Sequence, residues 1–247
     1  MINSEAEALF LLFSRIYTAT ILIPIVVAIW QWKYLNKVLK VFLTYRVLAF
    51  LFNLLEQIFI YLAYKHFEVI QPFVTYWGIK DTNFLAILYQ LNAIAFLGWF
   101  YLLLLPSKYK FWLKWITILI FMAVSINYFF IEGYLAFGKF NPNTTAIFSF
   151  GIASIYLWFI YKFYLTLPLA KNPYFWLSFG VIIPYLVGFF LELIGEVIHE
   201  ENFNFFVTLS VLKNCFLIIG QFLMAIGFWR ARYAQYLSLP EEKANTV

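Results

Sequence analysis

The residues with the clearest chemical potential are ionisable side chains inside long apolar stretches. Glu192, Glu196 and His199 are spaced so that two carboxylates and an imidazole share one face of a helix. Carboxylate di-iron bundles use the Glu-x-x-His spacing, but such a centre needs a second motif, and the other histidine, His66, stands alone. A single metal on Glu192, Glu196 and His199 is a weak candidate. The sequence therefore predicts no metal site and no cofactor.

Other catalytic chemistries lack the residues that they need. Two histidines are too few for a three-histidine zinc site, and the sequence has no Gly-x-Ser-x-Gly elbow, HExxH motif or phosphate-binding loop. Lys213 invites comparison with the Schiff-base lysine of microbial rhodopsins, but Leu209 stands where those proteins carry an aspartate. A membrane-embedded enzyme and a retinal-binding protein are therefore distant alternatives.

A second group of polar residues shares a depth rather than a motif. If each apolar stretch is a helix, these side chains lie roughly 8–15 Å below the predicted outer surface. They are Arg15, Glu56, Gln90, Asn92, Asn127, Glu192, Lys213 and Asn214. Because an unpaired charge inside a membrane is costly, we expect Arg15 to lie beside Glu56 and Glu192 beside Lys213. The layer predicts either a site for a small polar ligand or ion, or structural ion pairs that fix the helix order.

The sixth apolar stretch has a weakened backbone next to this layer. Gly180, Pro184 and Gly188 precede Glu192, and a proline inside a helix removes a backbone hydrogen bond. These three residues are hinge candidates, although a static kink is an equal interpretation. On the second apolar stretch, Arg46 shares a face with Glu56.

The composition shows which elements must position these residues. Of 247 residues, 64% are hydrophobic and 12% are charged, about half the charged fraction of a typical soluble domain. Seven apolar stretches are each long enough to cross a bilayer as a helix. They cover about residues 8–30, 40–64, 83–105, 111–132, 144–166, 174–198 and 204–229. The prediction is an all-α integral membrane protein, a single polytopic domain over 1–247 that ends in a short polar cytoplasmic tail over 231–247.

Basic residues predict how the bundle is oriented. They gather in alternate loops and at the end of the last stretch, as Lys33, Lys37, Lys40, Lys108, Lys110, Lys114, Lys162, Lys171, Arg230 and Arg232. The positive-inside rule makes these loops cytoplasmic, with the N-terminus outside and the C-terminus inside. This pattern explains the net charge of +5 without a nucleic-acid partner. The longest outer loop, about 65–82, is rich in aromatic residues and is expected to lie on the membrane surface.

The first three and the last three helices show a weak similarity. Asn92 and Gly98 in the third stretch correspond to Asn214 and Gly220 in the seventh, at the same six-residue separation. With the fourth helix between them, both halves run in the same direction, as in several transporter folds. The alternative is that aromatic-rich helices resemble one another by composition alone. A parallel 3+1+3 repeat is therefore one of two open interpretations.

Three short motifs carry a resemblance to a known group of proteins. They are Asn172-Pro173-x-Phe175-Trp176, Asn83-Phe84-Leu85 and Gly227-Phe228-Trp229. In these motifs the chain resembles small seven-helix proteins of the bacterial inner membrane that are often encoded next to sensor histidine kinases. The resemblance implies an inner-membrane location and a role in signalling, and it implies no catalytic residues.

Two functions remain in view. The first is a non-enzymatic membrane sensor or receptor-like protein, in which an unknown small polar ligand or ion contacts the polar layer and shifts the sixth helix. Its partners would be the lipid bilayer, that ligand and a cytoplasmic signalling protein. The alternative is a small-molecule or ion transporter of 3+1+3 architecture. A purely structural membrane protein is more distant.

Overall fold

The structure is a computed structural model that describes residues 4–79, 82–134, 138–163, 168–201 and 203–237. Side chains are described for these residues except 4–8, 10–11, 163, 192, 194–201 and 203. Every element in the described ranges is helical. Within them, seven helices are long and apolar enough to cross a membrane. The predicted seven-helix membrane bundle is therefore confirmed.

The first transmembrane unit consists of α1 (Ser4–Thr20) and α2 (Leu22–Trp30). The backbone N–H of Ile21 still donates to the carbonyl of Tyr17 at 3.2 Å, so the two segments continue one another. A 3₁₀ turn, η1 (Trp32–Tyr34), leads to α3 (Lys37–Lys65). Asn36 caps α3, because its Oδ1 accepts a hydrogen bond from the N–H of Leu39 at 3.0 Å.

The remaining elements follow the predicted order with small differences in their bounds. They are α4 (Phe67–Trp77), η2 (Asn83–Leu85), α5 (Ala86–Leu104), α6 (Ser107–Ile126), the π-helical turn η3 (Asn127–Ile131), α7 (Phe140–Phe163), η4 (Leu169–Lys171), α8 (Pro173–Glu201), α9 (Phe203–Trp229) and η5 (Ala231–Tyr236). The fourth and fifth transmembrane helices begin earlier than predicted, at Ser107 and Phe140. Their first turns are polar, which hid them from a search for apolar stretches.

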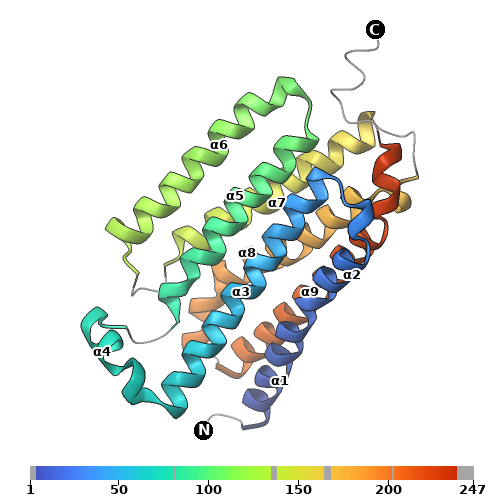
Figure 1. Cartoon of the computed structure of the whole chain (residues 1–247). Coiled ribbons are helices and arrows are strands. Elements are labelled where there is room, and N and C mark those ends of the chain that lie inside the picture. The colour runs from blue at the N-terminus through green and yellow to red at the C-terminus, as the bar shows by residue number, and fades with distance from the viewer. Residues whose placement is uncertain (1–3, 80–81, 135–137, 164–167, 202, 238–247) are drawn as a thin grey trace.

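The segment predicted as a surface loop contains the helix α4. Its aromatic residues Phe67, Phe73, Tyr76 and Trp77 are exposed, and only Ile70 of this helix is buried. Figure 1 shows α4 turned away from the bundle at the end where the N-terminus lies. A short helix with exposed aromatic rings suits the headgroup region of a bilayer.

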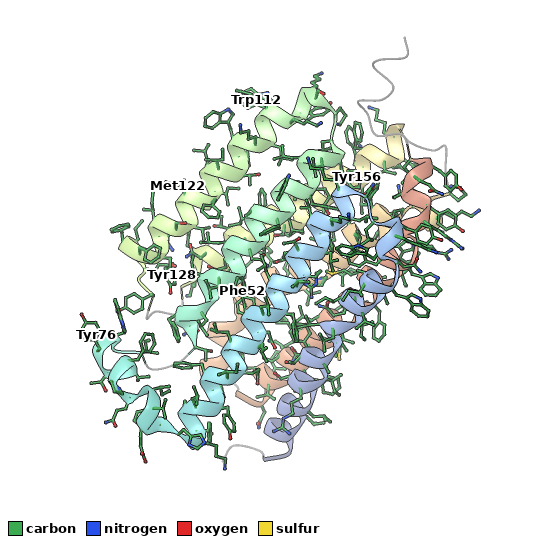
Figure 2. All side chains as sticks on the ribbon, in the orientation of Figure 1. Phe52, Tyr76, Trp112, Met122, Tyr128 and Tyr156 are labelled. Carbon is green, nitrogen blue, oxygen red and sulfur yellow. The ribbon has the colours of Figure 1, made fainter. Side chains whose placement is uncertain are left out.

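Six of the seven transmembrane units surround a common centre. The α1–α2 unit packs on α9, which packs on α8, followed in turn by α7, α5 and α3, and α3 returns to α2. The seventh unit, α6, packs mainly on α5 and lies at the edge of the bundle (Figure 1). Its residues Trp112 and Met122 point away from the other helices (Figure 2) and are more than half exposed.

Large, fully buried aromatic side chains gather at the C-terminal end of the bundle, where α3 and α8 begin and α5 and α9 end. Here the ring of Phe42 lies 4.9 Å from that of Phe100 and 6.0 Å from that of Phe228. All three side chains are fully buried. We call these three residues the aromatic layer. Figure 1 places the two chain termini at opposite ends of the bundle, and the assignment of the C-terminal end to the cytoplasm remains a prediction.

The segment predicted as a polar tail begins as part of the folded bundle. Ala231 and Ala234 in η5 are buried and belong to the hydrophobic core. Residues 238–247 of the predicted tail lie outside the described residues.

Candidate functional site

A cavity of about 420 Å³ lies at the centre of the bundle. Six transmembrane units contribute to it, and only α6 does not. Its described lining residues are Tyr17, Tyr45, Arg46, Ala86, Tyr89, Gln90, Pro142, Thr145, Ala146, Gly180, Pro184, Tyr185, Gly188, Lys213, Leu217, Gln221 and Met224. We call this the central cavity. The helices α3 and α9 begin at opposite ends of the bundle, and Arg46 and Lys213 each lie roughly 14 Å from the start of their own helix. The central cavity, which both residues line, is therefore at mid-membrane depth.

Arg46 is the most unusual residue of the central cavity. Its side chain is only 5% exposed. Nη2 donates a hydrogen bond to Oε1 of Gln221 at 2.6 Å, and the guanidinium carbon lies 5.4 Å from the centre of the Tyr45 ring. The Nε atom is buried without a hydrogen-bond partner. Among the described residues, no carboxylate forms an ion pair with this guanidinium.

Tyrosine hydroxyls join the helices around Arg46. The hydroxyl groups of Tyr45 on α3 and Tyr185 on α8 form a hydrogen bond of 3.1 Å. The Tyr89 hydroxyl on α5 donates to Oε2 of Glu56 on α3 at 2.9 Å. Together with Tyr17 on α1, these rings give the central cavity walls that are apolar on their faces and polar at their hydroxyl groups.

Two further polar atoms of the lining residues are buried without a partner. They are Oε1 of Gln90 and Oγ1 of Thr145, and the Thr145 side chain is only 4% exposed. A buried polar atom without a hydrogen bond costs about 1–3 kcal/mol, so such atoms are rare in folded proteins. They add polar groups from α5 and α7 to the lining of the central cavity.

The structure brings five residues of the predicted layer to the central cavity or next to it. Gln90 and Lys213 line it, and Glu56 is joined to it through the Tyr89 hydroxyl. Asn92 is buried behind Tyr45, with its Nδ2 donating to the Tyr45 carbonyl at 3.1 Å. Asn214 is buried next to Lys213 on α9 but does not line the cavity.

Two other residues of the predicted layer lie elsewhere. Arg15 is exposed on α1, and it forms no ion pair with Glu56, although both side chains are described. Asn127 belongs to the turn between α6 and α7, where its Nδ2 donates to Oε2 of Glu132 at 2.7 Å and to Oδ1 of Asn141 at 3.0 Å. These bonds hold the π-helical turn against the start of α7, which explains why Asn127 is buried.

Three predicted side chains belong to a part of α8 of which the structure describes only the backbone. Those of Glu192, Glu196 and His199 lie outside the described residues, and only the helical backbone of α8 is described there. The pairing of Glu192 with Lys213 and the weak metal candidate therefore remain predictions.

The three hinge candidates all line the central cavity, but their surroundings differ. Gly180 and Gly220 allow α8 and α9 to approach closely, since a Cβ atom on Gly220 would lie 3.0 Å from the Gly180 carbonyl oxygen and would also collide with Pro184. A Cβ at Gly188, in contrast, would have no atom of a more distant described residue within 4 Å. Any bend at Gly180 must therefore move α9 together with α8.

Sequence reasoning missed Arg46, Gln221 and the four cavity tyrosines as site residues. Arg46 was available as a candidate, because it is an ionisable residue within a membrane span on the same helix face as Glu56. Its greater distance from the predicted outer surface excluded it from the layer. Tyr185 shares a helix face with Glu192 in the same way, whereas Tyr17, Tyr45 and Tyr89 carry no such signal in a chain with 18 tyrosines.

Among the described lining residues, Arg46 offers positive charge and the tyrosines offer hydroxyl groups to a bound molecule. Arg46 and Lys213 are the charged residues among its described lining, and both are basic. This arrangement suits recognition of an anion with an apolar body. Neither protein-family models nor curated proteins nor solved structures show a match to this chain.

Proposed function

We propose that this chain is a non-enzymatic sensor or receptor-like protein of the bacterial inner membrane whose central cavity binds a small organic anion from outside the cell. The observation that carries the proposal is the buried guanidinium of Arg46, which lines a cavity and has a neutral hydrogen-bond partner, Gln221.

The energetics of a buried charge support this ligand class. Placing one cation in the middle of a membrane costs several kcal/mol unless an opposite charge accompanies it. Gln221 accepts a hydrogen bond but cannot neutralise Arg46. An anionic ligand supplies that charge, and the planar guanidinium favours carboxylates and related oxyanions because it can donate two parallel hydrogen bonds to them.

The closed end of the bundle supports sensing over transport. The aromatic layer of Phe42, Phe100 and Phe228 lies between the central cavity and the predicted cytoplasmic end. A transporter must open this layer in every cycle, whereas a receptor only needs to transmit a shift through it. The close approach of Gly180 to Gly220 couples α8 to α9, which gives a bound ligand a route to the predicted cytoplasmic face and to a signalling partner there.

The alternative is a small-molecule or ion transporter with a 3+1+3 arrangement. One observation favours it: Asn92 and Asn214, which correspond in the predicted repeat, are both buried near the central cavity. In such folds, substrate sites lie near the bilayer midplane between the repeats.

Radiolabelled benzenesulfonate separates these functions, because it stays charged and does not cross a bilayer unaided. If the protein is a sensor, the wild type binds benzenesulfonate in detergent solution and the Arg46→Gln variant does not. Proteoliposomes that contain the wild type then take up no more benzenesulfonate than protein-free vesicles. Uptake that depends on Arg46 would establish the transporter instead. Absence of both binding and uptake would contradict the anion site.

A further inference from the structure

A second hollow, of about 530 Å³, lies at the C-terminal end of the bundle where α2 and α9 end. It is lined by Trp30, Gln31, Lys33, Tyr34, Trp229 and Arg232. We call it the C-terminal groove. It shares no lining residue with the central cavity, so what it binds is independent of the function proposed above.

Two cations face this groove without an acidic partner. Among the described residues, no carboxylate forms an ion pair with Lys33 or Arg232. Instead, Nζ of Lys33 lies 4.9 Å from the centre of the Tyr34 ring, and the guanidinium carbon of Arg232 lies 4.9 Å from that of Tyr233. Aromatic rings orient a cation but leave its full charge available to an anion.

The positive potential extends beyond the lining residues. Lys171 and Arg230 also lie against the Tyr233 ring, each 5.9 Å from its centre. The hydrogen bond from Arg232 to the Tyr233 hydroxyl, together with these charges, lowers the pKa of Tyr233. The basic side chains therefore converge on one edge of the bundle.

Two indole rings place the groove at the level of lipid headgroups. Trp30 and Trp229 pack edge to face with ring centres 5.5 Å apart, yet they are 73% and 47% exposed. Exposed tryptophan at the ends of transmembrane helices is typical of the membrane interface. Indole N–H, phenol O–H and amide groups add hydrogen-bond donors for phosphate oxygens.

An exposed apolar track leads from the groove along both helices. Val26 on α2 and Ile226 on α9 are exposed and lie one turn before Trp30 and Trp229. Phe222, two turns before Trp229, and Ile29, directly before Trp30, are exposed as well. Acyl chains attached to a headgroup in the groove would cover these side chains. A free phosphate ion would leave these side chains exposed.

We propose that the C-terminal groove binds the phosphate headgroup of an anionic phospholipid, with Lys33 and Arg232 contacting the phosphate and the apolar track contacting the acyl chains. In the predicted orientation this lipid belongs to the cytoplasmic leaflet, whose negative lipids attract basic residues at the ends of membrane spans.

The test compares thermal unfolding of the full chain in neutral detergent with added phosphatidylglycerol, phosphatidylcholine or inorganic phosphate. Phosphatidylglycerol should raise the melting temperature of the wild type, and the other two should not. In the double variant Lys33→Gln/Arg232→Gln, the apparent affinity for phosphatidylglycerol should fall by about tenfold or more.

The control is Lys108→Gln/Lys114→Gln, which removes the same charge at the same end of the bundle but on α6. This control should show the wild-type rise in melting temperature with phosphatidylglycerol. The variant Lys33→Arg/Arg232→Lys, which retains both charges, should show most of that rise. Equal losses in the two charge-removing variants would reduce the effect to general electrostatics and overturn the proposal. If inorganic phosphate stabilises the protein as strongly as the lipid does, the groove binds a free anion instead. If Lys33→Gln/Arg232→Gln fails to fold and Lys33→Arg/Arg232→Lys does not respond to the lipid, Lys33 and Arg232 have a structural role and the proposal is wrong.

Discussion

At the scale of single residues, Arg46 and Gln221 form a pair that serves binding better than stability. The hydrogen bond from Nη2 of Arg46 to Gln221 is short, at 2.6 Å, but it leaves a net positive charge buried. Replacing both partners of a buried polar pair by apolar residues of similar shape is often neutral or stabilising, whereas removing one partner is costly. A structural role and a binding role of Arg46 therefore predict different changes in the free energy of unfolding when Arg46 is replaced.

The double variant Arg46→Met/Gln221→Leu should be at least as stable as the wild type, because it removes together the acceptor and a buried charge that forms no ion pair among the described residues. The single variant Gln221→Leu should lose about 1–3 kcal/mol, because the guanidinium then lacks its acceptor. Thermal unfolding in detergent measures both. If the double variant unfolds well below Gln221→Leu, Arg46 has a structural role and the binding account loses its main support.

Only part of the site could be predicted from residue types and depth. Gln90 and Lys213 were found because mid-membrane polar residues are costly unless they face one another or water. Asn127 was assigned to the same layer, although its amide is used by Glu132 and Asn141 in the turn between α6 and α7. Depth alone cannot distinguish a polar residue that faces a cavity from one that holds a turn.

At the scale of elements, α8 and α9 approach each other closely at a crossing beside the central cavity. Gly180 and Gly220 face each other with no side chains between them, and Pro184 packs over Gly220. Small residues at such crossings let transmembrane helices gain van der Waals contact along their length. This crossing therefore fixes one wall of the cavity.

A matched pair of glycine substitutions tests this role. Gly220→Ala should lower the stability by about 1–3 kcal/mol, since its methyl group would collide with Pro184 and meet the Gly180 carbonyl. Gly188→Ala, on the cavity side of α8, should be neutral or stabilise by up to about 1 kcal/mol, because its methyl group enters open space. The melting temperatures of the two variants check this, and an equal loss in both would show that the crossing is not the constraint.

The number and order of the spans followed from the apolar stretches, but their packing did not. Gly98 and Gly220 occupy corresponding positions in the predicted repeat, yet a Cβ on Gly98 would meet Thr117 of α6, whereas Gly220 faces α8. Their neighbours are thus not equivalent. The identity of the helix that a glycine faces depends on the whole arrangement, which a single sequence does not encode in its periodicity.

At the scale of the whole molecule, the bundle is divided along its axis. The C-terminal end is closed by the buried aromatic layer around Phe42, while the middle holds a cavity with polar walls. The proposed receptor function requires such a division, together with ligand access to Arg46 from the predicted outer side.

The central claim is that Arg46 binds the negative charge of a small organic ligand. The most direct measurement is the melting temperature of the full chain in the presence of benzoate or of benzamide, which has the same shape without the charge. Benzoate should stabilise the wild type, by about 2.7 kcal/mol at a concentration one hundred times its Kd. Benzamide should have a much smaller effect, and Arg46→Gln should not respond to benzoate. Equal stabilisation by the two compounds, or a full benzoate response in Arg46→Gln, would contradict the account.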